Sequence, residues 1–357
     1  MKIMFFIGSM GRGGAERVIS ILANHYAQKN WQVEIVLLLE NSVQYELDDK
    51  IKIIDLSRKD SYIKNLFYWI FNIRKCVKRE KPDRIVSFIG RINYLVLTAM
   101  FGTKIPIIVS ERNDPKHDGR GRFLQFYGNI CYKLATAIVF QTNYEKLCFK
   151  EDLYRKSFII ANPVEVSFPP KKTFSKKLEV VTAGRLRNQK NQELLVKAFN
   201  IVNKKFPSLE LKIYGEGPLR NRLESLIKSY NLSSKAMLCG NVTDLHKRIS
   251  DSTIFVLTSE YEGLSNALIE AMMLGLPCIT TDYPGADEII KNNINGLIVP
   301  RNDEKSLAEA IQRIMEDNEL REKLSNEARK TAELYREDVI LKKWDSVIEN
   351  RRSKINE

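Results

Sequence analysis

The sequence predicts an α/β protein built from two domains, and three observations support that prediction. Short apolar runs rich in β-branched residues alternate with amphipathic helical patterns, as strands and crossover helices do in parallel sheets. The first apolar run leads directly into a glycine-rich turn. A proline-rich stretch from Ala161 to Pro170, followed by lysines, interrupts the alternation, which restarts at Glu179.

The chain length of 357 residues fits two domains of ordinary size. We therefore expect a first domain over residues 1–165, a linker over 166–177 and a second domain over 178–335. For the remaining residues, 336–357, we expect a C-terminal segment that contains a final amphipathic helix.

The composition is that of a globular protein, with 44% hydrophobic and 28% charged residues, which excludes disordered and fibrous classes. The five cysteines are scattered without a C-x-x-C pair, which indicates a reducing compartment and argues against a zinc site. The three histidines lie far apart and no D-x-D string occurs. We therefore expect neither a required metal nor a cofactor.

No segment of the sequence indicates secretion or membrane spanning. The apolar run from Ile3 to Ile7 is too short for a secretory signal, and no stretch approaches the roughly 18 apolar residues of a spanning helix. We expect a cytoplasmic protein.

The net charge of +13 is unevenly distributed. Residues 1–172 contain 28 Lys and Arg against 17 Asp and Glu, whereas residues 173–357 contain 29 against 27. The excess in the first half predicts an anionic partner, which charge alone leaves open between nucleic acid, a phosphorylated substrate and an acidic membrane.

The first half begins as a nucleotide-binding fold does. A strand from Lys2 to Ile7 is followed by a glycine-rich turn, Gly8 to Gly14, and a helix from Ala15 to Lys29. Glycines let a backbone approach phosphate, although the spacing differs from the dinucleotide pattern G-x-G-x-x-G. Further strands are predicted at Val33–Leu39, Arg84–Phe88, Ile105–Ser110 and Ala137–Phe140.

A basic amphipathic helix is predicted within residues 61–81, where Trp69 and several other apolar side chains adjoin five basic residues. Such a helix suits an anionic membrane surface. The pattern fits equally well a helix that faces the core and has a solvated basic end.

In the second half, Gly184 to Asn191 (GRLRNQKN) follows a strand over Glu179–Ala183 and opens a helix. Arg185 and Lys190 there are candidates for a diphosphate clamp. Other strands are predicted at Leu211–Tyr214, Met237–Val242, Thr253–Leu257, Cys278–Thr281 and Leu297–Val299, and helices at Glu304–Glu316, Glu319–Leu334 and Arg336–Arg351.

The stretch from Leu257 to Ile290 combines a buried strand, a polar loop and a short helix capped by Ser265 or Asn266 and ending at Met273. The helix start offers backbone N–H groups at residues 263–266 to an anion. Glu262 lies in the loop and Glu270 in the helix. Taken alone, both glutamates would be read as solvated surface positions.

The string EGLSNALIE from Glu262 to Glu270 resembles the E-x7-E signature of retaining glycosyltransferases of family 4, which have two Rossmann-like domains (the GT-B architecture). The tail GGAER of the first turn and the G-R-L…K-N element of the second half are similar to the corresponding family elements. The resemblance covers essentially the whole chain and is weaker from Ser42 to Lys104.

This resemblance implies an acceptor-binding first domain, a nucleotide-sugar-binding second domain and a last helix that returns to the first domain. It implies a retaining, metal-independent transfer from a nucleotide diphosphate sugar, with UDP-sugar the first choice, in bacterial surface polysaccharide or glycan biosynthesis. The acceptor would be a glycan, for example one linked to polyprenyl diphosphate. The enzyme would be cytoplasmic or peripheral on the inner face of the cytoplasmic membrane.

The resemblance also assigns roles to residues of this chain. Arg185, Lys190 and Glu262 would be catalytic, with the two cations on the donor's phosphates and Glu262 on the sugar hydroxyls. Glu270 would bind the ribose hydroxyls. The main chain near Val242 would contact the nucleotide base. Donor contacts are also expected from Gly13, Gly14, Gly263, Leu264, Ser265 and Asn266.

One loop departs from the family pattern. Many relatives place a histidine in the loop that corresponds to Ser110–Pro115, whereas this chain has Arg112. Arginine stays protonated and cannot act as a general base, so we expect Arg112 to bind the donor's phosphate or a sugar hydroxyl. His117 lies nearby, but a lone loop histidine is more often incidental.

Three other functions remain as alternatives. A nucleotide-sugar epimerase of the same architecture would need carboxylates and histidines around the sugar, and histidines are scarce here. A nucleic-acid-binding protein would explain the basic half but not the glutamates beside an anion site, so we expect no nucleic-acid partner. A dehydrogenase would need a different glycine spacing in the first turn.

Overall fold

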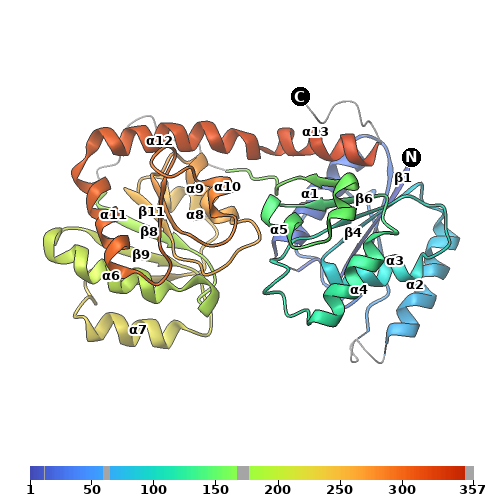
Figure 1. Ribbon diagram of the computed structural model, residues 1–357, viewed down its shortest axis with the longest axis horizontal. Coiled ribbons are helices and arrows are strands. Elements are labelled where there is room, and N and C mark those ends of the chain that lie inside the picture. Colours follow the sequence, from blue (N-terminus) through green and yellow to red (C-terminus); the bar gives the residue numbers. More distant parts are fainter. Residues whose placement is uncertain (12, 59–64, 167–176, 350–357) are drawn as a thin grey trace. The chain divides into compact units, whose positions relative to one another are not determined.

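The computed structural model describes residues 1–11, 13–58, 65–166 and 177–349 (Figure 1). The chain divides into two compact units, one of Met1–Pro163 together with the chain from Asp338 onward, the other of Val164–Glu337. Each unit contains one sheet in which the paired strands run parallel, with helices packed on it, so the predicted α/β fold class is confirmed.

The sheet of the first unit has seven strands in the order β3-β2-β1-β4-β5-β6-β7. Nearly every residue of its central strands is buried because helices cover both faces, as a parallel sheet requires. The strands are β1 (Lys2–Ile7), β2 (Gln32–Leu37), β3 (Lys52–Asp55), β4 (Arg84–Phe88), β5 (Ile107–Ser110), β6 (Ala137–Phe140) and β7 (Ser157–Ile159).

Alternate residues of β1 divide the core of this unit in two. Ile3 and Phe5 face α1 and α13, whereas Met4 and Phe6 face the layer that includes α2, α3 and α4. This division follows from the two-residue period of a strand. The helices are α1 (Gly14–Gln28), α2 (Leu66–Glu80), α3 (Gly90–Ala99), α4 (Arg122–Tyr132), α5 (Asn143–Leu147) and α13 (Glu337–Ile348), with a 3₁₀ helix η1 (Glu151–Lys156).

The sheet of the second unit has six strands in the order β10-β9-β8-β11-β12-β13. They are β8 (Glu179–Ala183), β9 (Glu210–Tyr214), β10 (Ala236–Gly240), β11 (Ile254–Leu257), β12 (Cys278–Thr281) and β13 (Leu297–Val299). The helices are α6 (Gln192–Lys205), α7 (Arg220–Ser229), α8 (Leu245–Ile249), α9 (Asn266–Met273), α10 (Ala286–Ile289), α11 (Glu304–Glu316) and α12 (Asn318–Ala332), with 3₁₀ helices η2 (Asn188–Lys190) and η3 (Glu333–Tyr335).

Both sheets reverse their strand order once, and the loops that follow the strands at the reversal therefore lie side by side. In the first unit the order reverses between β1 and β4, and in the second between β8 and β11. Ligands of open parallel sheets bind at the carboxyl ends of the strands at this switch point. The loops after β1 and after β8 are the glycine-containing loops that the sequence analysis singled out.

The structure adds elements that the sequence analysis did not predict, including β3 and β7 at the two edges of the first sheet. Edge strands are short and only partly buried, so their sequences lack a strong apolar pattern.

The basic helix begins at Leu66, and the predicted residues 61–64 lie outside the described part of the chain. Residues 167–176 of the predicted linker and residues 350–351 of the predicted last helix also lie outside it.

Helix α13 packs on the first unit through both apolar and polar contacts. Trp344 is fully buried and stacks on Phe88 of β4, with ring centroids 5.7 Å apart. The Asp345 carboxylate accepts hydrogen bonds from the Tyr26 hydroxyl at 3.0 Å and from Lys29 Nζ at 2.6 Å. Asp345 Oδ1 also lies 3.0 Å from His25 Nε2.

We predict that Asp345→Asn lowers the free energy of unfolding by about 1–2 kcal/mol at neutral pH. Burial opposes ionisation of this carboxyl, but the contacts from His25, Lys29 and Tyr26 outweigh it and lower its pKa to about 2. A lowered pKa stabilises the fold above the unfolded value near 4, and that contribution is lost as the pH falls from about 4 toward 2.

Urea unfolding of both proteins between pH 7 and pH 3 measures this difference. The gap between wild type and variant should narrow at the acid end. A gap that stays constant over this range would contradict the assignment.

Candidate functional site

The loops after β8 and β11 meet at the switch point of the second sheet and form the candidate site. Backbone contacts join them: the Glu260 N–H donates to the Gln189 carbonyl at 2.8 Å. Side chains add to this, since the Thr258 hydroxyl donates to the Lys190 carbonyl at 2.8 Å and the Gln189 amide donates to the Tyr261 carbonyl at 2.9 Å. The two loops are therefore held side by side.

An ion pair between Lys190 and Glu262 lies between these loops. Lys190 Nζ is 2.5 Å from Glu262 Oε1, and the Ser259 hydroxyl donates to the same oxygen at 2.5 Å. Only 8% of the Glu262 side chain is exposed. The interpretation of Glu262 as a solvated loop residue is therefore wrong, because its carboxylate is buried and pairs with Lys190.

Helix α9 begins beside this pair, at the predicted position. Ser265 is the N-cap residue, with an extended backbone and no side-chain capping bond, and the Ile269 N–H donates back to its carbonyl. The N–H groups of the first turn thus face the loop rather than the helix. This geometry offers an anion site.

Two buried hydroxyls near Glu262 have no hydrogen-bond partner within the described residues: those of Ser265 and Tyr283. Burial, together with the negative charge of Glu262, raises the pKa of Tyr283 well above its usual value, so this hydroxyl stays protonated. Buried polar groups are almost always paired in native proteins, with protein, water or a ligand. These two hydroxyls therefore leave polar capacity for a bound group at this place.

Glu270 lies one turn into α9 and is 9% exposed, so its interpretation as a solvated helix position is also wrong. Its carboxylate is 3.4 Å from His246 Nε2 of α8. His246 received no role from the sequence, because it is a lone histidine outside any motif. Only the contact between α8 and α9 brings it to Glu270.

Arg185 projects from the loop after β8 and is exposed. Close packing of glycines holds this loop: a Cβ on Gly215 would lie 2.1 Å from the Gly184 carbonyl oxygen, and Gly215 has φ +129°. Val242, after β10, and Leu264 are half-buried against the same apolar cluster as α9. The structure thus gathers Arg185, Lys190, Glu262 and Glu270 at one end of one sheet.

The first unit has its own loop at a switch point, after β1. Gly13 is the N-cap of α1, and its N–H and carbonyl both bond the Tyr45 hydroxyl, at 3.2 and 2.8 Å. A Glu16 carboxylate oxygen lies so near that a Cβ on Gly13 would come within 2.2 Å of it. The carboxylate therefore occupies the helix start where phosphate was expected, and the donor contact of Gly13 and Gly14 stays a prediction.

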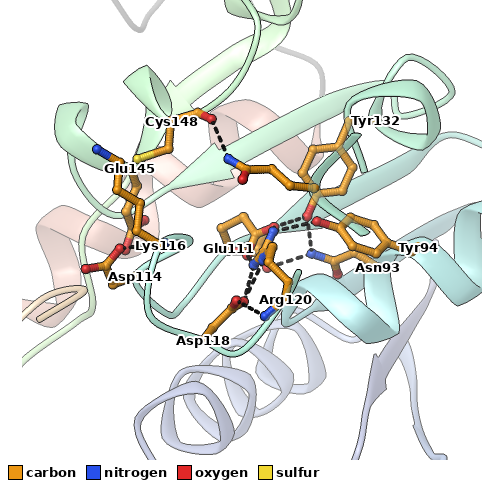
Figure 2. A network of polar contacts seen from close by, with 12 residues as sticks. Asn93, Tyr94, Glu111, Asp114, Lys116, Asp118, Arg120, Tyr132, Glu145 and Cys148 are labelled. Atoms are coloured by element: carbon orange, nitrogen blue, oxygen red, sulfur yellow. Dashed lines mark hydrogen bonds and ion pairs between the residues drawn. The ribbon is translucent and has the colours of Figure 1, made fainter. Parts of the chain in front are cut away.

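The loop after β5 is anchored by a buried polar network (Figure 2). Arg120 binds both carboxylate oxygens of Glu111, at 2.9 and 2.8 Å, and the Tyr132 hydroxyl donates to the same carboxylate. Asp118 Oδ2 accepts from Arg120 Nε at 2.7 Å and also pairs with Arg120 Nη2. This bidentate pair closes the loop from residue 111 to residue 120. Within the loop, His117 Nδ1 lies 2.7 Å from Asp114 Oδ2.

Arg112 lies in the same loop but points into the unit rather than outward. Its guanidinium is 4.9 Å from the Phe88 ring and 5.4 Å from the Trp344 ring, and it donates to Asn162 at 2.8 Å. Burial lowers the pKa of Arg112 to about 9. This geometry favours a role in joining β5 to α13 and residue 162, and a contact of Arg112 with the donor stays a prediction.

No group of three or more His, Cys, Asp and Glu residues is placed to hold a metal ion, within the ranges that the structure describes. Over the same ranges, no helix has both the length and the hydropathy needed to cross a membrane.

Two family models match consecutive parts of this chain. The model described as "Glycosyltransferase Family 4" matches residues 12–168, and the model "Glycosyl transferases group 1" matches residues 164–331. Between them they span both units, and the second contains the Lys190–Glu262 pair and Glu270. The chain belongs to family 4 of the glycosyltransferases, as the sequence analysis predicted.

Curated relatives from Campylobacter jejuni match over nearly the full length. One is 29% identical, covering 98% of each chain, and is a GalNAc-α-(1→4)-GalNAc-α-(1→3)-diNAcBac-PP-undecaprenol α-1,4-N-acetyl-D-galactosaminyltransferase. Another is 28% identical, covering 94% of this chain and 95% of its own, and is an N-acetylgalactosamine-N,N'-diacetylbacillosaminyl-diphospho-undecaprenol 4-α-N-acetylgalactosaminyltransferase.

Among solved structures, Anabaena HepE in complex with UDP aligns with a TM-score of 0.85 over 98% of this chain and all of that chain, at 16% identity. At that identity the likeness shows the fold alone. It confirms the predicted architecture of two Rossmann-like domains.

We predict that His246→Gln raises the KM for the nucleotide-sugar donor severalfold while kcat changes little. The imidazole holds the Glu270 carboxylate, which we expect to bind the ribose, far from the bond that breaks. Exposed or partly exposed ion pairs contribute about 1 kcal/mol or less, which corresponds to a severalfold change.

Steady-state kinetics on the variant separate KM from kcat, and Arg248→Gln on the same helix is the matched control. Arg248 is exposed and pairs with Asp244 rather than with Glu270. Equal donor KM values in both variants would remove His246 from the site.

Proposed function

We propose that this glycosyltransferase moves a sugar from a nucleotide diphosphate sugar, with UDP-sugar as the first candidate, to a lipid-linked glycan. The transfer retains the anomeric configuration and needs no metal. The observation that carries the proposal is the Lys190–Glu262 pair beside the start of α9, with two unpaired buried hydroxyls next to it. This set offers a cation, helix N–H groups and a carboxylate to one ligand.

The positive groups act on the leaving diphosphate. As the bond from the anomeric carbon to the phosphate oxygen breaks, negative charge grows on that oxygen. Lys190, Arg185 and the N–H groups of residues 263–266 stabilise this charge. Groups already held in place toward developing charge give the largest electrostatic contribution to catalysis.

The two glutamates hold the sugars of the donor. Glu262 accepts hydrogen bonds from hydroxyls of the transferred sugar, and Glu270 from those of the ribose. For donor binding, Lys190 exchanges its contact with Glu262 for the phosphate. Cationic side chains and helix N–H groups take the place that a divalent metal has in other phosphate sites.

Retention follows if the acceptor hydroxyl attacks on the face from which the diphosphate departs. The acceptor oxygen then forms its bond to the anomeric carbon as the phosphate bond breaks. The hydroxyl proton passes to the leaving phosphate oxygen, so no side chain serves as the base.

Two lines of support point to a lipid-linked acceptor and to work at the inner face of the cytoplasmic membrane. The Campylobacter relatives act on undecaprenol-diphosphate-linked sugars by name. The excess positive charge lies in the first half of the chain, in the unit assigned to the acceptor. A polyprenyl diphosphate acceptor brings both negative charge and a membrane.

We predict that one nucleoside diphosphate raises the melting temperature of the protein and that Glu270→Ala abolishes this rise. A ligand that binds only the folded state stabilises it by mass action. A thermal-shift screen of UDP, GDP, ADP and their common sugars, with NAD as the control, measures it. No response to any nucleotide, together with salt-sensitive binding to nucleic acid, would refute the proposed function.

We also predict that Lys190→Ala weakens donor binding and lowers kcat together, with kcat/KM reduced about 100-fold or more. The lysine contacts the phosphate in the ground state and gains importance as charge develops. Donor titration and initial rates measure the two effects. Lys204→Ala, an exposed lysine on α6, is the matched control, and unchanged kinetics in Lys190→Ala would exclude Lys190 from the site.

A further inference from the structure

We propose that a cavity at the amino ends of β1, β2 and β3 in the first unit, here called the amino-end cavity, binds a sugar phosphate, either free or as part of a nucleotide. The loop after β1, like the loops of the candidate site, lies at the carboxyl ends of strands. The amino-end cavity lies at the opposite ends of the strands. It is therefore a separate site, and it is independent of the proposed function.

The cavity has the size of a small-molecule site, with a volume of about 370 Å³. Lys2, at the start of β1, and Lys52, at the start of β3, form part of its wall. The wall also includes Trp31, Glu34 and Lys50. The N-terminus, marked in Figure 1, lies at this end of the sheet because β1 begins at the second residue.

Glu34 is a buried carboxylate in β2, with 4% of its side chain exposed. One carboxylate oxygen, Oε1, lies 2.9 Å from Lys2 Nζ and 3.2 Å from Lys52 Nζ. The other oxygen, Oε2, has no hydrogen-bond partner among the described residues. A buried acceptor without a partner costs free energy, so a ligand that donates a hydrogen bond to Oε2 is favoured here.

The charges around the cavity leave a positive excess. Glu80, at the end of α2, lies 3.0 Å from Lys2 Nζ and 2.8 Å from Lys52 Nζ, so two carboxylates balance these two lysines. Arg79 also pairs with Glu80 and adds a positive charge. Lys50 is exposed and forms no ion pair within the ranges that the structure describes. A phosphate group would therefore be attracted to Lys50 and to the half-exposed Lys52.

Trp31 supplies a flat aromatic part of the wall. It follows α1 directly after Asn30, and its ring stacks on Tyr26 with the ring centroids 4.6 Å apart. The backbone N–H of Trp31 donates to the Tyr26 carbonyl at 3.0 Å, so the residue is held in place. Its side chain remains partly exposed. The face of an indole packs well on the ring of a sugar or of a base.

These three features together select the ligand class. A fully ionised phosphate accepts hydrogen bonds from lysines but has no proton to donate to Glu34 Oε2. A sugar hydroxyl donates that bond, and the sugar ring or an attached base packs on Trp31. Inorganic phosphate alone would leave the glutamate oxygen unsatisfied, and a divalent cation would be repelled by the three lysines of the wall.

Tryptophan fluorescence of the full chain tests the inference, with glucose 1-phosphate and UMP as probes. The chain has three tryptophans, and Trp69 and Trp344 are fully buried, so a small solute reaches only Trp31. We expect at least one probe to change the fluorescence in a saturable way, with a dissociation constant of about 1 mM or lower. The change should be absent in Trp31→Phe.

Two variants remove the proposed contacts, and calorimetric titration measures their effects. Glu34→Gln should weaken binding of the probe by about tenfold or more but leave binding of inorganic phosphate unchanged. The lysines hold the remaining oxygen of the amide, so its nitrogen takes the place of Oε2 and cannot accept a bond. Lys50→Gln should weaken the probe and inorganic phosphate alike, by about threefold to tenfold.

Each variant has a matched control. Glu80→Gln disturbs the same two lysines as Glu34→Gln but removes no group from the cavity wall. Lys104→Gln neutralises an exposed lysine of the first unit that does not belong to the wall. Both controls should bind the probe at least as tightly as wild type does, and melting temperatures of the same samples verify that all variants are folded.

The outcomes separate this site from the donor site. Tighter binding of glucose 1-phosphate than of UMP would assign a free sugar phosphate, and the reverse order a nucleotide. No saturable change with either probe, equal losses in variant and control, or binding of inorganic phosphate as tight as that of both probes would overturn the inference. Glu270→Ala should leave the Trp31 signal unchanged. Stabilisation by a nucleoside diphosphate without any Trp31 signal would overturn this inference and leave the donor site standing.

Discussion

The ion pair between Lys190 and Glu262 is the contact on which the candidate donor site depends. It joins a loop that follows β8 to one that follows β11, and these strands are neighbours only because the sheet reverses its order between them. Parallel strands point their carboxyl ends the same way, so loops distant in sequence meet at this edge. A lysine and a glutamate separated by about seventy residues thereby become one site.

The same constraint shapes the first unit but leaves a second place open to a ligand. Its sheet is covered on one face by α1 and α13 and on the other by the layer that contains α2, α3 and α4. Both faces must be covered because the strands are apolar on both sides. The ends of the strands are then the parts of the sheet that a small molecule can reach, and the amino-end cavity lies at one of them.

Much of the fold could be predicted because its strongest patterns are local. β1, β4, β6, β8, β12 and β13 were predicted at their observed bounds, as was α11, since continuous β-branched runs and clear helical periodicity need no tertiary information. β3 and β7 were missed because edge strands bury little. In the candidate site, the motif singled out Glu262 and Glu270. The sequence alone was equally compatible with two exposed surface glutamates, and only their burial in the structure excluded that alternative.

The sequence by itself determined the fold class, the family and the loops that carry the candidate site, because turn residues, periodicity and the spacing of two glutamates are properties of short segments. The tertiary structure alone decided that His246 contacts Glu270 and that Arg112 packs against the rings of Phe88 and Trp344. It also decided which phenylalanines remain at the surface. These depend on which helix packs beside which strand, and burial is set by neighbours that lie far away along the chain.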